Sequence, residues 1–326
     1  MPEPKLVTPK PASHDVIDWL LAGDVAIQYQ TRRDLLDEDR PDLRQRISAE
    51  GWGAVLIAAR RDDGSWGGGF YQPKWTSSHY TLLDLRNLEV DPGHPLLRES
   101  VRLITTREKR SDGGVGPGKT IGASDVCVAG MFLNYASYFG EAETDLRSVV
   151  DFLIGQHMLD GGFNCQSNRS GARHSSLHSS VSVLEGIHSY CSSGYGHRAA
   201  ELRVIADRCR EFILMHRLFK SDRTGEIIRR DFLALPYPWR WKYNILRALD
   251  CFAACRYPWD DRMQDAVDVL LAKRRAEGFW LMQAALPGDV HVQMEKPRQP
   301  SRWNTLIALR ALRYFDSARS RRNAHV

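Results

Sequence analysis

The 326-residue sequence lacks several features that would assign it to a particular class of protein. No apolar run approaches the roughly 18 residues that a membrane-spanning helix needs, so we expect no transmembrane segment. Six cysteines are too few for a disulfide framework in a chain of this length, and we expect them to be thiols. Residues 1–13 contain four prolines and no apolar stretch. They predict a disordered tail rather than a secretory signal, and hence a cytoplasmic protein.

The charge is not strongly biased, because 45 Lys and Arg residues stand against 40 Asp and Glu residues. Hydrophobic residues make up 43% of the chain, which is typical of a globular protein with a substantial core. Basic residues gather near the C-terminus, at Arg310, Arg313, Arg319, Arg321 and Arg322. We interpret residues 317–326 as a solvated basic tail and expect no nucleic-acid partner.

Patterns typical of β-strands are nearly absent, whereas a turn centred on glycine recurs along the chain. Successive turn glycines are 49, 48, 64 and 53 residues apart, a period that suits two helices and their connections. The turns are Asp63-Gly64-Ser65-Trp66, Asp112-Gly113-Gly114-Val115, Asp160-Gly161-Gly162-Phe163, the weaker Thr224-Gly225-Glu226-Ile227, and Glu277-Gly278-Phe279-Trp280.

Helical patterns lie on both sides of these turns, and the segment after each turn is the more apolar one. A helix that is apolar on most of its circumference is buried, so we expect these second helices to form an inner ring. They are predicted at 78–88, 124–138, 177–190, 241–254 and 302–315, and residues 15–36 supply a sixth pair. The sequence therefore predicts an all-α protein with a single α/α toroid over residues 14–316.

The recurring Asp-Gly-Ser-Trp and Asp-Gly-Gly-Phe turns resemble the squalene cyclase repeat. This repeat is characteristic of the superfamily of terpenoid cyclases and protein prenyltransferase β-subunits, and the similarity spans residues 51–315. The resemblance implies an α/α toroid that acts on a hydrophobic, isoprenoid-type substrate in a central cavity. Prenyltransferase β-subunits work with an α-subunit, but the sequence itself indicates no particular protein partner.

Polar triplets occupy equivalent positions at the predicted starts of the inner helices, so we expect them to form one layer at a rim of the ring. The triplets are His79-Tyr80-Thr81, Asp125-Val126-Cys127, His178-Ser179-Ser180, Lys242-Tyr243-Asn244 and Arg302-Trp303-Asn304. The candidate catalytic residues in this layer are Asp125, His79 and Tyr243, and we expect the cavity to be reached from this rim.

A carboxylate, a thiolate and an imidazole can together bind zinc and leave one coordination position open. Asp125, Cys127 and His178 form such a set, with His174 as the substitute ligand. The same arrangement resembles the zinc site of prenyltransferase β-subunits, which implies a metal-bound thiolate as the attacking group. The alternative interpretation makes Asp125 a helix cap, Cys127 a core residue and His178 a polar group at a loop edge.

Basic and aromatic residues near this rim are candidates for substrate binding. Lys119, Lys242 and Arg302 would hold an anionic group, unless they are rim charges in water. Trp241 and Trp303 would line the cavity with aromatic faces, unless they are ordinary core residues.

The function predicted from the sequence is a prenyltransferase-like or terpene-cyclase-like enzyme, assisted by zinc. One alternative is a metal-independent cyclase or isomerase in which a carboxyl group donates the proton, although no Asp-x-Asp-Asp motif occurs. A second alternative is a toroid that binds a hydrophobic ligand without catalysis. Asp260 and Asp261 are interpreted as helix-capping acids rather than as a magnesium site.

Overall fold

The computed structural model describes residues 14–117 and 122–323, so the predicted N-terminal tail and Lys119 lie outside the described residues. Within these ranges six helical hairpins follow one another, each with an outer helix and then an inner one. The outer helices are α1 (His14–Leu21), α4 (Gly51–Ala58), α6 (Pro95–Arg107), α8 (Glu143–Gly155), α11 (Ala199–Met215) and α13 (Gln264–Ala272). The inner helices are α2 (Val25–Leu36), α5 (Ser78–Asn87), α7 (Val126–Tyr138), α10 (Leu177–Ser192), α12 (Ile245–Ala254) and α14 (Arg302–Asn323).

The remaining elements are short and lie in the connections. The helices α3 (Pro41–Arg46) and α9 (Ser167–Ser170) follow α2 and precede α10, respectively. Three 3-10 turns cover Lys74–Thr76, Arg230–Leu233 and Asp261–Met263. The strands β1 (Trp280–Leu281) and β2 (Pro300–Ser301) pair in antiparallel fashion. No helix in the described ranges is both long enough and apolar enough to cross a membrane.

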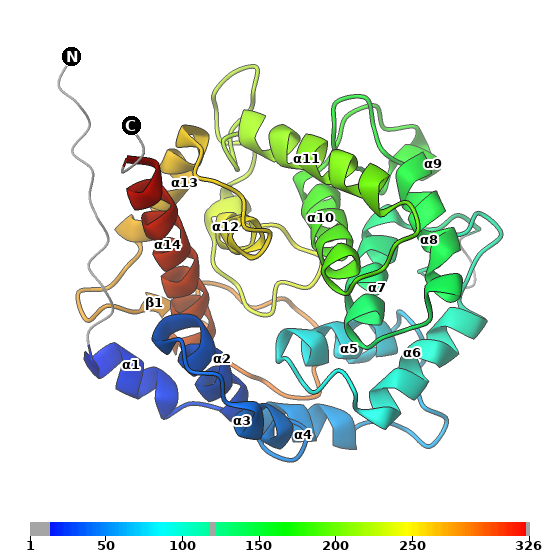
Figure 1. Ribbon diagram of the computed structural model, residues 1–326, viewed down its shortest axis with the longest axis horizontal. Helices are drawn as coiled ribbons and strands as arrows, with labels where there is room; N and C mark the ends of the chain where they lie inside the picture. The colour runs from blue at the N-terminus through cyan, green and yellow to red at the C-terminus, as the bar shows by residue number, and fades with distance from the viewer. Residues whose placement is uncertain (1–13, 118–121, 324–326) are drawn as a thin grey trace.

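The inner helices form a closed ring. Neighbouring pairs pack together from α5 through α7, α10 and α12 to α14, and α14 packs on α2. Figure 1 shows this closure, with the red C-terminal helix beside the blue N-terminal one. The ring is completed between α2 and α5, where the side-chain amide of Gln30 donates to the carbonyl oxygen of Asn87 at 2.9 Å. The α/α toroid predicted from the repeat is confirmed.

The recurring turns share one hydrogen-bonding scheme, which explains why the sequence repeats. The last residue of the turn is a fully buried aromatic residue at Trp66, Phe163 and Trp280. In each case its backbone N–H donates to a hydroxyl on the following inner helix, at 2.9 to 3.0 Å. The indole N–H groups of both tryptophans also donate to a carbonyl of the preceding outer helix. Each turn therefore anchors an outer helix to its inner partner.

The turn glycines adopt a backbone conformation that other residues rarely adopt. Gly113 has φ +89° and Gly161 has φ +95°, and a Cβ atom at Gly113 would lie 2.8 Å from the carbonyl oxygen of Ser148. The weaker fourth turn departs from the scheme, because Ile227 is exposed instead of being buried beneath the turn.

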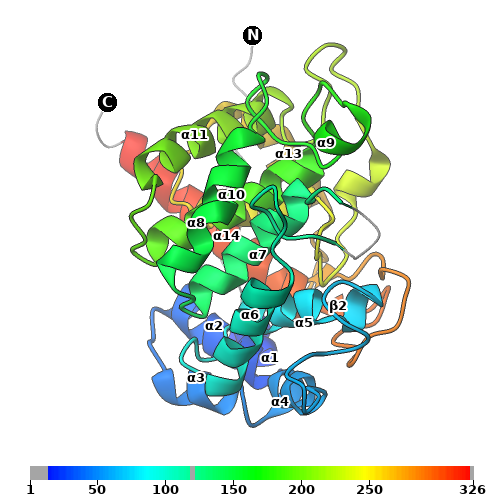
Figure 2. The same cartoon turned by 90° about the vertical axis from the view of Figure 1, so that its right-hand side faces the viewer.

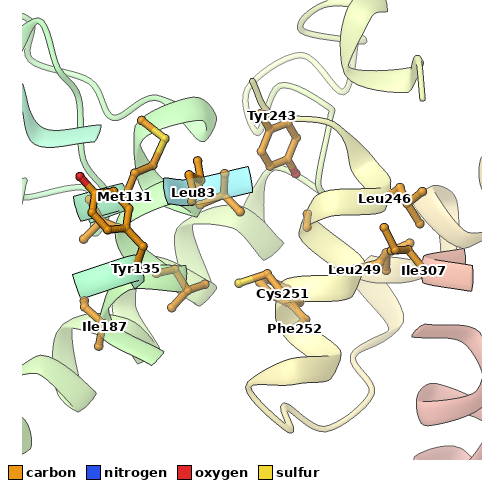
Figure 3. Close-up of a cluster of buried hydrophobic side chains, with 14 of the residues drawn as sticks. Leu83, Met131, Tyr135, Ile187, Tyr243, Leu246, Leu249, Cys251, Phe252 and Ile307 are labelled. Atoms are coloured by element: carbon orange, nitrogen blue, oxygen red, sulfur yellow. The ribbon is translucent and has the colours of Figure 1, made fainter. Parts of the chain in front are cut away.

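The core lies between the inner helices. Figure 3 shows apolar side chains from α5, α7 and α10 facing others from α12 and α14, including Met131, Leu246 and Ile307. Burial of this apolar surface is the main stabilising contribution to the ring. Cys251 belongs to this cluster, and its sulfur points from α12 toward α7 and α10.

Two long connections cover the rim at which the inner helices begin. The segment before α12 ends in Asn244, which caps that helix, so α12 begins four residues later than the sequence pattern predicts. The segment between β1 and β2 reaches the 3-10 turn Lys74–Thr76 that precedes α5, where the Trp75 indole donates to the carbonyl oxygen of Pro287 at 2.6 Å. Figure 2 shows both connections on one side of the ring, opposite the C-terminal end of α14.

The last helix is longer than the sequence predicts. α14 continues to Asn323, so the helix includes most of the segment that we interpreted as a basic tail from residue 317. Arg310 does not contribute to a solvated basic cluster, because its guanidinium forms an ion pair with Asp250 inside the ring.

Candidate functional site

A cavity of about 680 Å³ lies in the centre of the ring. All of the inner helices contribute to its wall, together with the segment that precedes α12. Seven arginines and five carboxylates line it: Arg33, Arg86, Arg240, Arg247, Arg256, Arg310 and Arg313, with Asp34, Asp37, Glu89, Glu185 and Asp250. Aromatic residues complete the wall at Tyr237, Trp239, Trp303 and Tyr314.

The cavity opens at the C-terminal ends of the inner helices. Asp37 and Arg313, which lie in its wall at this end, are exposed. At the other end Trp303 is buried, and so are Tyr237 and Arg240, which belong to the covering connection that precedes α12. The prediction that the cavity is reached from the rim with the polar triplets is therefore wrong, because long connections close that rim.

Glu185 and Arg247 form a two-pronged ion pair in the wall. Glu185 lies on α10 and Arg247 on α12, with Nε–Oε1 and Nη2–Oε2 distances of 2.8 and 2.7 Å. The Arg247 side chain is 2% exposed. Such paired geometry is the strongest arrangement available to an arginine and a carboxylate. The pair therefore fixes both charges within the wall.

Arg310 joins three inner helices through a second set of contacts. Its guanidinium binds Asp250 of α12 with distances of 2.6 and 2.7 Å and also contacts Asp34 of α2 at 3.2 Å. Burial acts to raise the pKa of Asp34, but the Arg310 and Arg33 guanidinium groups outweigh it and lower that pKa. Asp34 is therefore held as a carboxylate.

The positive charge in the wall is not fully neutralised. Arg240 is paired with Asp84, which lies behind the wall and is 4% exposed. Burial raises the pKa of Asp84, although Arg240 opposes that effect. Arg86 and Arg256 form no ion pair with a carboxylate in the described part of the chain. The cavity is therefore suited to an anionic ligand.

Several hydrogen-bond donors at the closed end have no partner within the described protein. They are the indole Nε1 atoms of Trp239 and Trp303 and the Nε atom of Arg240. Trp303 is 1% exposed, and its ring stacks on Tyr237 with centroids 4.8 Å apart and planes 17° apart. Buried donors without acceptors cost free energy, so this end of the cavity favours a ligand that carries acceptor oxygens.

The substrate-binding residues predicted from the sequence are placed differently from one another. Trp303 lines the cavity as expected. Arg302 does not, because its Nε donates to the carbonyl oxygen of Trp19 at 3.0 Å and its guanidinium lies over the Trp19 ring. Lys242 and Trp241 precede α12, where the lysine ammonium lies 5.7 Å from the indole centroid. Neither of these two residues lines the cavity.

His178 and Tyr243 contact each other where α10 meets the segment before α12. The Tyr243 N–H donates to Nδ1 of His178 at 2.8 Å, and the Tyr243 hydroxyl donates to the carbonyl oxygen of Leu218. The His178 ring lies against Phe232 and Trp241. Burial and the nearby Arg229 lower the pKa of His178 to about 4, so its imidazole is neutral at pH 7. These contacts hold the covering connection on α10.

The predicted zinc ligands are not assembled. His178 uses Nδ1 to accept a hydrogen bond from the backbone N–H of Tyr243, and the backbone N–H of Cys127 donates to the sulfur of Cys165 at 3.2 Å. Asp125 is the N-cap residue of α7 and is 6% exposed. Throughout residues 14–117 and 122–323, no group of three His, Cys, Asp or Glu side chains is placed to hold a metal ion. The residues present do not fit a zinc site, and zinc binding stays a prediction.

The other candidates near this rim are also occupied in packing. His79 is fully buried, its Nδ1 lies 3.2 Å from the Tyr135 hydroxyl, and burial lowers its pKa to about 3. His174 is exposed and lies in the loop before α10 rather than on that helix, so it is not a substitute ligand on the predicted helical face. Asp260 caps the turn before α13 by accepting from the N–H of Arg262, which confirms its interpretation as a capping acid.

Apart from Trp303, the residues that line the cavity are not among the site residues predicted from the sequence. The available signal is a charged side chain within an otherwise apolar inner helix, as at Glu185, Arg247, Asp250 and Arg310. A charge in such a position requires a partner, and here each of these residues forms an ion pair and lies in the cavity wall.

Comparisons with known proteins support the fold. Neither known family descriptions nor curated proteins give a match to the sequence. Among solved structures, an unsaturated glucuronyl hydrolase specific for heparin matches with a TM-score of 0.51 and 10% identity, over 96% of this chain and 91% of that chain. The type II terpene cyclase MstE from Scytonema matches with a TM-score of 0.35 and 13% identity, over 83% of this chain and 97% of that chain.

A second structure of that cyclase, the R337A variant with geranylgeranyl dihydroxybenzoate, matches with a TM-score of 0.33 and 12% identity, over 84% of this chain and 96% of that chain. The similarity to the unsaturated glucuronyl hydrolase supports the α/α-toroid fold. It leaves the chemistry of this chain to be argued from the cavity.

Proposed function

We propose that this chain is an α/α-toroid enzyme whose substrate joins an anionic group to a ring or an apolar chain and binds in the central cavity. The observation that carries the proposal is the set of unpartnered donors at the closed end, Trp239 Nε1, Trp303 Nε1 and Arg240 Nε. Each such donor costs about 1–3 kcal/mol while it is buried without an acceptor. A carboxylate or a phosphate supplies the acceptors and complements the surplus arginine charge.

The remainder of the ligand would lie against aromatic and aliphatic side chains. The stacked rings of Tyr237 and Trp303 lie in the wall, and Leu83 and Ile307 contribute aliphatic surface. Aromatic faces accommodate both sugar rings and isoprenoid chains, because the CH groups of both pack against π-systems. The shared chemistry of the ligand is therefore an anionic headgroup with a flat or apolar body.

Two classes of compound have this chemistry. The first is a saccharide that contains a uronic acid, which the similarity to an unsaturated glucuronyl hydrolase makes the first probe. The second is a prenyl diphosphate, which is the isoprenoid substrate predicted from the sequence. The charged wall and the polar donors favour the saccharide, whereas the aromatic faces suit either compound.

Isothermal titration calorimetry with the full chain tests the proposal. The probes are an unsaturated heparin disaccharide and farnesyl diphosphate, with glucose and farnesol as uncharged counterparts. We expect one anionic probe to bind and its uncharged counterpart to bind at least about tenfold more weakly, because a hydrogen bond to a charged group contributes about 1.5–3 kcal/mol. Incubation with the bound probe, followed by mass spectrometry, shows whether it is converted.

Arginine variants connect the binding to the cavity. Arg86→Gln and Arg256→Gln each remove a wall cation that has no ion-pair partner among the described residues, and we expect both to weaken binding of the anionic probe. Arg302→Gln is the matched control, because that side chain is held against Trp19 outside the cavity. Failure of both anionic probes to bind, or equal losses in Arg86→Gln and Arg302→Gln, would refute the proposal.

A further inference from the structure

The open end of the cavity carries positive charge that its wall does not neutralise. Arg86 lies in the last turn of α5 and Arg256 follows the end of α12, and both line the cavity. Each carboxylate of the wall is paired with a different arginine. Among the described residues, the open end therefore holds two cations without a counter-ion.

Arg86 is held in position, but its hydrogen-bond donors are not all used. Its guanidinium lies 5.6 Å from the centroid of the Tyr138 ring, and its Nη1 atom donates to Oδ1 of Asn87 at 3.4 Å. Burial raises the pKa of Tyr138 to about 12, so this contact brings no negative charge at pH 7. The Nε atom of Arg86 is buried and has no acceptor in the described protein. A buried donor on a cation favours an anionic acceptor.

The open end is separated from the donors at the closed end by the length of a helix. Trp303 and Arg313 both line the cavity and both lie on α14, so they are about 15 Å apart along the helix axis. A single anionic group cannot contact both ends. Arg240 at the closed end is already paired with Asp84, so that end suits one carboxylate, and the open end suits a further negative charge.

The wall also contains a buried acceptor without a donor. Asn134 lies within α7 and lines the cavity, and its side chain is 2% exposed. Its Oδ1 atom has no hydrogen-bond partner in the described protein. A sugar hydroxyl group can donate to this amide oxygen, whereas an isoprenoid chain has no donor to offer. The wall therefore favours a saccharide over a prenyl chain.

We propose that the ligand of this cavity is an acidic saccharide that carries two anionic groups, one for each end. A carboxylate of the saccharide binds the buried donors of Trp239, Trp303 and Arg240, and its second anionic group binds Arg86 and Arg256. This inference rests on the proposed function and specifies its substrate class. A saccharide with one acidic group leaves one set of donors unused and binds more weakly.

Calorimetry of the full chain with three unsaturated disaccharides provides the test. Each probe has two sugar rings, and the first ring is an unsaturated uronic acid. The second ring carries sulfate groups in the heparin disaccharide, a carboxylate in unsaturated digalacturonate, and no acidic group in the unsulfated heparin disaccharide. We expect at least one doubly acidic probe to bind about tenfold more tightly than the singly acidic one. The tighter of the two identifies the second anionic group, and equal affinities for all three would overturn the inference.

Two variants assign the anionic groups to the two ends. Arg256 is exposed, so Arg256→Gln should fold normally. It should weaken binding of the doubly acidic probe about tenfold and that of the singly acidic probe much less, whereas Trp303→Phe should weaken both about tenfold. Arg86→Gln should act as Arg256→Gln does. Arg302→Gln is the control outside the cavity and should change neither affinity. Equal losses for the two probes in Arg256→Gln would show that the open end holds no second anionic group.

The same measurements distinguish failure of this inference from failure of the proposed function. If farnesyl diphosphate binds and none of the disaccharides does, the cavity binds an anion but the ligand is not an acidic saccharide. If the singly acidic disaccharide binds as tightly as the other two, the proposed function stands and the second anionic group does not. If no anionic probe binds, both proposals are wrong.

Discussion

Asp84 on α5 and Arg240 on the segment before α12 form an ion pair inside the ring, with Oδ2 and Nη2 3.1 Å apart. The two residues are 156 positions apart in sequence, and each side chain is only 4% exposed. The Arg240 guanidinium also lies 4.7 Å from the centroid of the Trp75 ring. The pair therefore attaches a covering connection to an inner helix and sets the position of Arg240 at the closed end of the cavity.

Replacement of Asp84 should destabilise the fold strongly. Asp84→Asn leaves the Arg240 charge buried without a compensating anion, and we expect the free energy of unfolding to fall by about 3–5 kcal/mol. Urea denaturation followed by circular dichroism measures this loss. Asp42→Asn removes an exposed pair with Arg40, whose Nη2 atom lies 2.6 Å from Oδ2, and should leave the denaturation midpoint unchanged. Equal midpoints for the two variants would show that the buried pair contributes nothing to stability.

The turn glycines offer a matched test of backbone conformation. Gly161→Ala places a Cβ on a residue with φ +95°, at 3.0 Å from the carbonyl oxygen of Arg208, and we expect a loss of about 1–3 kcal/mol. Gly155→Ala is the control, because a Cβ there meets no atom within 4 Å and φ is not positive. This control should stabilise the protein by about 0.4–1 kcal/mol. Thermal denaturation of both variants distinguishes the two effects, and a stabilised Gly161→Ala would contradict the role of that turn.

The sequence predicted the ring but not the open end of its cavity, for a physical reason. Turn glycines and buried aromatic residues such as Trp66 and Phe163 act locally, so their spacing reveals the hairpins and the inner helices. Which rim is covered depends on contacts such as Trp75 with Pro287, which join segments 212 residues apart. No local pattern encodes such contacts.

The same limit applies to the site residues. Polar side chains at the helix starts were expected to face an open rim, yet Arg302 packs on α1 and His178 packs on a covering connection. Trp303 was placed in the cavity wall as predicted. Arg247 and Asp250 were missed, because only their positions within apolar helices distinguish them from surface charges.

Stability should decrease as the pH is lowered, in part because of His79. Burial lowers the pKa of this residue to about 3 in the folded protein, from an ordinary value of 6.5. Between these values the unfolded chain binds a proton that the folded chain does not, so the free energy of unfolding rises with pH by up to about 1.4 kcal/mol per unit. The stability that the folded protein has while His79 is neutral is fully present above pH 6.5. It is lost progressively as the pH falls toward 3.

A glutamine variant isolates this contribution. His79→Gln keeps a polar group near the Tyr135 hydroxyl but cannot take up a proton, so the pH dependence of unfolding between pH 6.5 and 4 should become shallower. Urea denaturation at half-unit intervals of pH gives the slope for each protein. His14→Gln is a control at an exposed histidine and should retain the slope of the wild type. An unchanged slope in His79→Gln would show that His79 takes up its proton in the folded state as it does in the unfolded chain.

Trp303 has an indole N–H without an acceptor among the described residues, whereas the indole N–H of Trp66 has one. Variants of the two residues therefore allow effects on ligand binding and on stability to be measured separately. Trp303→Phe keeps a ring against Tyr237 but removes an Nε1 donor that has no acceptor in the described protein. We expect the anionic probe to bind about tenfold more weakly, because the donor that the ligand would use is gone. The free energy of unfolding should change by less than about 1 kcal/mol, since loss of an unsatisfied donor offsets the smaller ring.

The control variant Trp66→Phe removes an indole N–H that donates to the carbonyl oxygen of Leu56 at 2.7 Å. That variant should lose about 1–3 kcal/mol of stability and bind the probe as the wild type does, because a buried acceptor loses its partner far from the cavity. Calorimetry measures the affinity for the probe and urea denaturation the free energy of unfolding of both variants. Equal affinities in the wild type and Trp303→Phe would show that Trp303 does not bind the probe.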